Sequence, residues 1–232
     1  MGLELKSVVP WGRCFDEYRR MFDLSDADLA RTLLDCGGGP ASFNTEMTQR
    51  GYTITSCDPI YQFSAVEIAQ RIDATYATII SGVLENLDHY VWREIPNPEV
   101  LGKVRMAAMT QFLADFPTGL AAGRYQVAAL PNLPFADHQF DLALCSHLLF
   151  TYSDQLSLAF HLEAIESLCR VASEVRIFPL LRLDGEASPW LPPILDRLQT
   201  QNLEYEVRIT AYEFQVGGNQ LLKIFSGNRG KA

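Results

Sequence analysis

The feature that most constrains this chain is a short apolar run that ends abruptly in glycines. Residues 32–36 read Thr-Leu-Leu-Asp-Cys, and Gly37-Gly38-Gly39-Pro40 follows at once. A brief run of this kind, bounded by turn residues, predicts a buried strand. The segment from Ser42 to about Arg50 predicts the helix that follows the turn. A buried strand that leads through glycines into a helix is a typical opening unit of an α/β fold.

The same alternation recurs along the chain. We predict further strands at residues 52–58, 125–130, 140–145, 173–178, 205–209 and 221–225, and helices that begin near residues 15, 25, 64, 97, 154 and 189. Ser153 is expected to cap the helix that begins at residue 154. Strands alternating with helices predict a doubly wound, mostly parallel sheet, here of about seven strands. The segment Gly217-Gly218-Asn219 lies between the last two strands and is typical of a hairpin. The last strand is therefore expected to be antiparallel and to lie at an edge of the sheet.

The segment between the second and third strands is too long for one crossover helix. Ser64 and Glu67 form the pattern of a capping box at the start of a long helix. Asn97 is expected to cap a second helix, which Pro117 and Gly119 are expected to end. We interpret residues 64–116 as a helical cap inserted after the second strand of a single domain, residues 1–232. Such an insertion leaves the sheet at the edge where open α/β sheets bind ligands.

Composition limits the classes of partner. The net charge is −9, and the sequence has no run rich in Lys and Arg. Binding to the phosphates of nucleic acid depends on clustered basic side chains, so the composition argues against a nucleic-acid partner. The sequence has no apolar stretch of the roughly 20 residues that a membrane helix needs. Residues 1–6 lack the pattern of a secretion signal. The five cysteines are scattered, without a Cys-x-x-Cys pair, which predicts a cytoplasmic protein with no structural metal site.

Two carboxylates belong to the region of the glycine turn. Asp35 stands just before the turn, and Asp58 ends the next predicted strand, 58 − 35 = 23 residues later. A carboxylate about 20 residues beyond such a turn can accept hydrogen bonds from ribose hydroxyls. A dinucleotide and S-adenosylmethionine both fit this geometry. The dinucleotide pattern places a third glycine where this chain has Ser42, and Asp35 would repel a pyrophosphate, so charge favours S-adenosylmethionine with its cationic ammonium.

Here the sequence resembles the class I S-adenosylmethionine-dependent methyltransferases, which have a Rossmann-like fold. Residues 33–39, Leu-Leu-Asp-Cys-Gly-Gly-Gly, are similar to the first motif of that family, and Asp58 is similar to its acid after the second strand. Residues 133–143, Leu-Pro-Phe-Ala-Asp-His-Gln-Phe-Asp-Leu-Ala, resemble the segment that leads into its fourth strand. The resemblance extends from Thr32 to the closing hairpin, and it implies S-adenosyl-L-methionine as the cofactor.

The resemblance implies roles for residues at the first two strands. Gly37 and Gly39 would let the backbone lie against the methionine part of the cofactor, while Asp35 would favour its ammonium. Asp58 would hold the ribose and Pro59 would flank the adenine. Residues 1–30 would form a helical segment over the cofactor.

Further roles are implied beyond these strands. Ser146 and His147 would line the pocket near the sulfonium, and Arg19 of the N-terminal helix would pair with the cofactor carboxylate. The chain departs from the family at Ala129, where many members have an acid that contacts the adenine amino group. Backbone groups near Leu130 are expected to take over that contact.

The acceptor of the methyl group is constrained less strongly. No Asn-Pro-Pro-Tyr, Asp-Pro-Pro-Tyr or Pro-Cys segment is present, which disfavours methylation of nucleic-acid bases, and we expect a small organic acceptor. His147 is the candidate general base because histidine titrates near neutrality; a packing role for it is the alternative. A non-catalytic S-adenosylmethionine-binding protein and an NAD(P)-binding oxidoreductase stay open as other functions.

Overall fold

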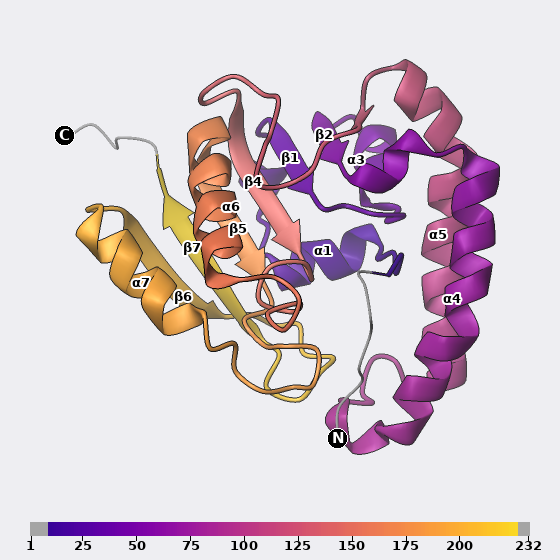
Figure 1. The fold of residues 1–232 in the computed structure, drawn as a ribbon. Helices are drawn as coiled ribbons and strands as arrows, with labels where there is room; N and C mark the ends of the chain where they lie inside the picture. Colours follow the sequence, from indigo (N-terminus) through magenta and orange to yellow (C-terminus); the bar gives the residue numbers. More distant parts are fainter. Residues whose placement is uncertain (1–8, 227–232) are drawn as a thin grey trace.

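The computed structural model describes residues 9–226, and its centre is one sheet of seven strands in the order β3-β2-β1-β4-β5-β7-β6 (Figure 1). The strands are β1 (Leu33–Cys36), β2 (Ile54–Cys57), β3 (Tyr125–Gln126), β4 (Phe140–Ser146), β5 (Ala172–Phe178), β6 (Glu204–Ile209) and β7 (Gln220–Phe225). The first five strands are parallel, and β7 is antiparallel to both β5 and β6. The predicted doubly wound, mostly parallel sheet of seven strands is confirmed.

Helices connect most of these strands (Figure 1). They are α1 (Phe15–Met21), α2 (Asp26–Leu29), α3 (Phe43–Gln49), α4 (Ala65–Glu85), α5 (Pro98–Ala121), α6 (Leu158–Val171) and α7 (Leu191–Thr200), with short 3₁₀ helices η1 (Pro59–Gln62) and η2 (Leu87–His89). The predicted caps Ser64 and Asn97 accept hydrogen bonds from the backbone N–H groups of Glu67 and Val100. These caps satisfy backbone groups that a helix start leaves unpaired.

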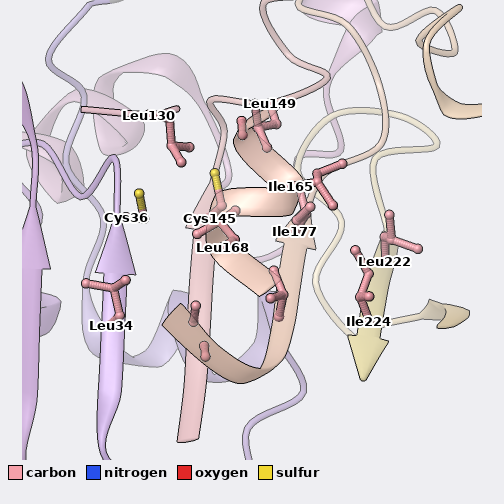
Figure 2. Close-up of a cluster of buried hydrophobic side chains, with 14 of the residues drawn as sticks. Leu34, Cys36, Leu130, Cys145, Leu149, Ile165, Leu168, Ile177, Leu222 and Ile224 are labelled. Carbon is pink, nitrogen blue, oxygen red and sulfur yellow. The ribbon is translucent and has the colours of Figure 1, made fainter. Parts of the chain in front are cut away.

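Two apolar layers cover the sheet because successive residues of a strand point to opposite faces. Leu34, Cys36, Cys145 and Ile177 point to the face covered by α6 and α7 (Figure 2), where Leu168 of α6 packs against them. The alternate positions point the other way. Leu33, Ile54, Leu142 and Leu144 pack on that second face against α1 and α3. Burial of both faces is expected for a parallel sheet.

The N-terminal helices belong to the second face. Tyr18 of α1 stacks on Phe43 of α3 with ring centroids 4.2 Å apart, and Phe22 meets Phe178 at the end of β5 edge to face. Both Tyr18 and Phe22 are almost fully buried. Aromatic burial of this size stabilises the attachment of α1 to the sheet.

Helices α4 and α5 lie side by side beyond the β2–β3 end of the sheet (Figure 1). Ile68 and Ile72 of α4 share a buried cluster with Phe112 and Phe116 of α5 and with Tyr125 of β3. The buried face of α4 therefore packs mainly against α5 rather than on the sheet.

Four details of the sequence prediction were wrong. Helix α5 does not end at Pro117 but continues to Ala121: Pro117 itself is exposed, and the buried Phe116 and Gly119 hold the last turn in place. Strand β3 has two residues instead of six, and the chain after Gln126 leaves the sheet. Ser157, not Ser153, caps α6. The Ser153 hydroxyl instead donates to the Phe150 carbonyl and lies 2.6 Å from the Ser188 hydroxyl.

The fourth detail concerns the hairpin. Strands β6 and β7 do pair antiparallel, but β7 lies between β5 and β6, so the edge strand is β6. Within residues 9–226, no helix combines the length and the apolar character needed to cross a membrane.

Candidate functional site

A cavity of about 480 Å³ opens at the carboxyl ends of the parallel strands. Its lining includes Cys36 and Gly37 after β1, Asp58 after β2, Ser146 at the end of β4 and Phe178 at the end of β5. This volume lies within the range of roughly 300–1,000 Å³ for small-molecule sites, and the carboxyl edge is where open α/β sheets bind ligands.

The glycine turn forms one wall of the cavity. Gly37 and Gly39 have φ angles of +72° and +53°, in the left-handed region that favours glycine. The Gly37 N–H donates to the Cys57 carbonyl over 2.8 Å, and the Tyr61 hydroxyl donates to the Gly39 carbonyl over 2.8 Å. A β-carbon on Gly37 would lie 2.8 Å from Leu148 Cδ2. These contacts fix the turn on the side away from the cavity, while its backbone lines the cavity.

Asp58 is tied to the same turn. Its Oδ2 accepts the Gly39 N–H over 3.0 Å, and its Oδ1 accepts the Ile60 N–H over 2.8 Å. Burial raises the pKa of the Asp58 carboxyl, and these two N–H donors oppose the rise. Each carboxylate oxygen can accept a second hydrogen bond. Asp58 therefore caps η1 and also presents free acceptor positions to the cavity.

Asp35 lies beneath the turn and is only 1% exposed. Its Oδ1 accepts the Tyr18 hydroxyl and its Oδ2 accepts the Ser56 hydroxyl, each over 3.1 Å. Burial raises the pKa of Asp35 to about 7, while these hydroxyl donors oppose the rise and the charge of Asp58 adds to it. A β-carbon on Gly38 would lie 2.3 Å from Asp35 Oδ2, so Gly38, which lines the cavity, packs directly on this carboxyl.

Ser146 and His147 stand at the end of β4. The Ser146 hydroxyl lies 2.9 Å from His147 Nδ1, and the His147 N–H donates to the Phe178 carbonyl over 2.7 Å. His147 has a φ of +50°, an uncommon conformation for a residue with a side chain. Burial, with the charges of Arg13 and Arg105, holds the pKa of His147 well below its usual range, so the imidazole is neutral at pH 7.

The structure brings most of the predicted site residues together around one cavity. Gly37, Gly39, Asp58, Pro59, Leu130, Ser146 and His147 all line it. Asp35 is behind the lining, at the contact with Gly38. Arg19 lies apart from the cavity: its guanidinium pairs with Asp26 over 2.7 Å, and both side chains are largely exposed. The helical periodicity that buries Tyr18 directs the next residue to solvent.

Sequence reasoning missed a second set of lining residues. Arg13 precedes α1, Thr151 and Tyr152 follow β4, and Tyr212 and Phe214 come from the β6–β7 connection. The Arg13 carbonyl accepts the Ser42 N–H over 3.1 Å, which holds Arg13 beside the helix that follows the glycine turn. No sequence pattern connects these residues, because they come from three separate segments that only tertiary packing brings together.

A buried ion pair supports this side of the cavity. Arg105 of α5 is fully buried, and its Nη1 lies 2.5 Å from Glu17 Oε2 of α1. The Tyr212 hydroxyl donates to Glu17 Oε1 over 3.0 Å. Burial opposes the charge on each partner, but their attraction outweighs it, lowering the pKa of Glu17 to about 2 and raising that of Arg105. The pair joins the insertion, α1 and the β6–β7 connection.

Comparison with known proteins places the chain in a family. The chain is 36% identical to the uncharacterized protein MJ0045 of Methanocaldococcus jannaschii over 227 residues, which cover 96% of this chain and 98% of that protein. The chain belongs to the MJ0045 family. No family model matches it.

Solved structures similar in fold to this MJ0045-family chain include two S-adenosylmethionine-dependent methyltransferases of low sequence identity. The magnesium protoporphyrin IX methyltransferase ChlM of Synechocystis PCC 6803, solved with bound S-adenosylmethionine, is 13% identical with a TM-score of 0.45, over 91% of this chain and 90% of that one. A methyltransferase of Aquifex aeolicus is 14% identical with a TM-score of 0.41, over 90% and 91% of the two chains.

Proposed function

We propose that this protein transfers a methyl group from S-adenosylmethionine to a small organic acceptor. The observation that carries the proposal is the meeting of Asp35, the glycine turn and Asp58 at one wall of the cavity. Asp58 presents free acceptor positions suited to ribose hydroxyls. The turn lets a ligand approach the backbone directly above the Asp35 carboxyl.

The charge of this wall suits a cationic ligand. A pyrophosphate beside the turn would approach Asp35 and Asp58 together, and like charges at short range in a buried site repel strongly. The ammonium of S-adenosylmethionine is attracted by the same pair. An NAD(P)-binding oxidoreductase is therefore the weaker candidate.

We assign the cofactor contacts as follows. Asp35 attracts the ammonium, Gly37 and Gly39 border the methionine part, and Asp58 holds the ribose. Pro59 and the backbone near Leu130 flank the adenine, and Ser146 lies beside the sulfonium. Arg19 is left out of this set because it is paired with Asp26 outside the cavity.

The chemistry needs little from the protein beyond alignment. When bound, S-adenosylmethionine supplies a methyl carbon already activated by the sulfonium. The chain's own residues hold the acceptor in line with it and exclude water, which can supply much of the acceleration. The neutral His147 imidazole has a free pair of electrons for a proton, but burial and the charges of Arg13 and Arg105 make it a weak base, so it is suited to an acceptor that gives up its proton easily. His147 borders the cavity beyond Ser146, on the side away from Asp58.

The insertion, residues 64–116, is proposed to cover the cofactor side of the cavity. Arg71, Ile79 and Val83 of α4 and Leu101 of α5 contribute to the lining. The described part of residues 1–30 adds Arg13 and Tyr18. The five cysteines are free thiols, which supports our proposal of a cytoplasmic setting.

Calorimetric titration tests the cofactor. We expect micromolar binding of S-adenosylmethionine and S-adenosylhomocysteine and no binding of NAD. Asp58→Asn should weaken both at least tenfold, since an amide loses charge-assisted hydrogen bonds. Asp137→Asn, at an exposed aspartate outside the cavity, is the matched control. NAD binding to the wild type in place of the other two would reject the proposal.

Methyl transfer needs a separate test. Cofactor labelled on its methyl group is incubated with the protein and with separate pools of metabolites and RNA. Label in the metabolite pool is expected. Label in RNA alone would reject a small acceptor, and cofactor binding with no label in either pool would favour a non-catalytic binding protein.

A further inference from the structure

The buried charges around the cavity are divided between its two halves. Asp35 and Asp58 lie at the ends of β1 and β2, where the proposed cofactor contacts are. On the other half, formed after β4 and β5 and by the β6–β7 connection, the charged group in the lining is Arg13. Arg71 also borders the cavity, but it is exposed on α4, where water screens its charge.

The Arg13 side chain extends from the first half into the second. Its backbone is held beside the glycine turn by the Ser42 N–H. Its charge acts on Tyr152, Tyr212 and His147, and also on Tyr18, which bonds to Asp35. The influences on the pKa of Asp35 itself come from Ser56, Tyr18 and Asp58. The guanidinium therefore borders the aromatic half of the cavity, and Tyr18 links it to the half that holds the two acids.

This half has one positive charge without a carboxylate. Arg13 and Arg105 supply two positive charges, and Glu17 supplies one negative charge that is bound to Arg105. Among residues 9–226, the Arg13 side chain donates a long hydrogen bond from Nη1 to the Trp11 carbonyl over 3.4 Å. Arg13 is partly buried, and its Nε is shut off from solvent without a hydrogen-bond partner in the same residues. An N–H left in this state costs free energy that an anion would recover.

A second polar group in the same half also lacks a partner. Thr151 is 7% exposed and lines the cavity, and its Oγ1 has no hydrogen-bond partner in the part of the chain that the structure describes. The remaining wall is largely aromatic, with Tyr152, Phe178, Tyr212 and Phe214. Phe178 meets both Tyr212 and His147 edge to face. A flat apolar body fits such a wall, and buried polar groups on it select a polar substituent.

We propose that the methyl acceptor is a monocarboxylic acid with a flat, apolar body, and that Arg13 binds its carboxylate while Thr151 donates a further hydrogen bond. This assignment rests on the proposed function and names the substrate class for it. One uncompensated positive charge matches one carboxylate. A phosphate dianion would leave a net negative charge in a poorly solvated site, which is costly.

Benzoate and benzamide are the probes for the acceptor site, because they have nearly the same shape and differ in charge. Their binding to the wild type saturated with S-adenosylhomocysteine is followed by ligand-observed NMR. We expect millimolar benzoate to bind and benzamide to bind at least tenfold more weakly. Arg13→Gln should lower benzoate affinity at least tenfold, since the charge-assisted pair is lost, and should leave S-adenosylhomocysteine affinity within about twofold. Arg197→Gln, on the exposed side of α7, is the matched control.

The outcomes separate this assignment from the proposed function. If the wild type does not bind S-adenosylhomocysteine, the proposed function itself is overturned. If it binds S-adenosylhomocysteine but fails to bind benzoate, or binds both probes equally, only the acceptor assignment is overturned. The same conclusion follows if Arg13→Gln weakens S-adenosylhomocysteine tenfold and leaves benzoate unchanged, because Arg13 would then serve the carboxylate of the cofactor.

Discussion

The Tyr18 hydroxyl donates a hydrogen bond to Asp35 Oδ1 over 3.1 Å, and both residues are almost completely shielded from solvent. The bond joins α1 to the carboxyl that lies beneath the glycine turn. Because it stabilises the ionised form of Asp35, it opposes the rise in pKa that burial causes. The N-terminal helix therefore helps to set the charge of the cofactor wall.

Tyr18→Phe removes that hydrogen bond and should raise the pKa of Asp35 above about 7. A larger share of the carboxyl is then neutral at pH 7, so we expect affinity for S-adenosylmethionine to fall by roughly three- to tenfold, the effect of a hydrogen bond to a charged group. The loss should shrink as the pH is raised to 9. Titration of the wild type and the variant across this range measures it, and a loss that is constant with pH would contradict the explanation.

Cofactor binding should release a proton near pH 6.5. The free protein holds Asp35 largely protonated below its pKa of about 7, and the ammonium of the cofactor favours the carboxylate. Binding heats measured in two buffers of different ionisation enthalpy should therefore differ. In Asp35→Asn, which carries no titrating group there, the two heats should agree. Equal heats for the wild type would reject a contact between Asp35 and the ammonium.

Asp35 should also make the free protein less stable as the pH rises. Its folded pKa of about 7 is above the ordinary 3.8, so the folded state binds more protons between these values. Stability is highest below pH 3.8 as far as this residue is concerned, falls as the pH rises through 7 and then levels off. At pH 8, Asp35→Asn should unfold at a higher urea concentration than the wild type. Its free energy of unfolding should be greater by up to about 4 kcal/mol, since each unit of pKa shift corresponds to 1.36 kcal/mol. The difference should be much smaller at pH 4.5.

The Glu17–Arg105 pair should show strong coupling. Arg105→Met leaves the Glu17 carboxylate buried with only neutral donors, the Tyr212 hydroxyl and the N–H and thiol of Cys14, and such an unpaired charge costs about 3–5 kcal/mol. Glu17→Gln combined with Arg105→Met should recover part of that loss. Urea unfolding of the four proteins in a double-mutant cycle measures the coupling, and additive effects would contradict it.

The same pair has a pH signature. The pKa of Glu17 is lowered from 4.5 to about 2, so its stabilisation is present above pH 4.5 and is lost as the pH falls toward 2. Glu17→Gln should flatten that part of the stability profile.

The sheet could be predicted because its strands carry strong local signals. Leu33-Leu34 before the glycines and Phe140 to Cys145 are short apolar runs between turn residues, and both are central strands. The parts that sequence reasoning missed depend on tertiary contacts. Ser153 and Ser157 are equally good caps by type, and the contact between Ser153 and Ser188 decides against the first.

The candidate site divides in the same way. Asp35 and Asp58 could be found because the glycine turn marks the end of one strand and β-branched residues mark the next. Arg13 has no such marker, since it precedes a helix and belongs to no periodic pattern. Arg19, within α1, has the same side chain and was predicted instead, but it points to solvent, where it pairs with Asp26.

The bond between Tyr212 and Glu17 spans 195 residues of sequence, and β7 enters the sheet between two strands that are made before it. During synthesis the N-terminal residues leave the ribosome first. The buried Glu17 Oε1 of helix α1 therefore waits for its hydrogen-bond donor until Tyr212 has been added. Strands β1 to β5 can pair early, but the wall that holds Tyr212 and Phe214 is completed last. A nascent chain that stops before this point has the glycines and both acids, and it lacks the wall that Tyr212 and Phe214 add to the cavity.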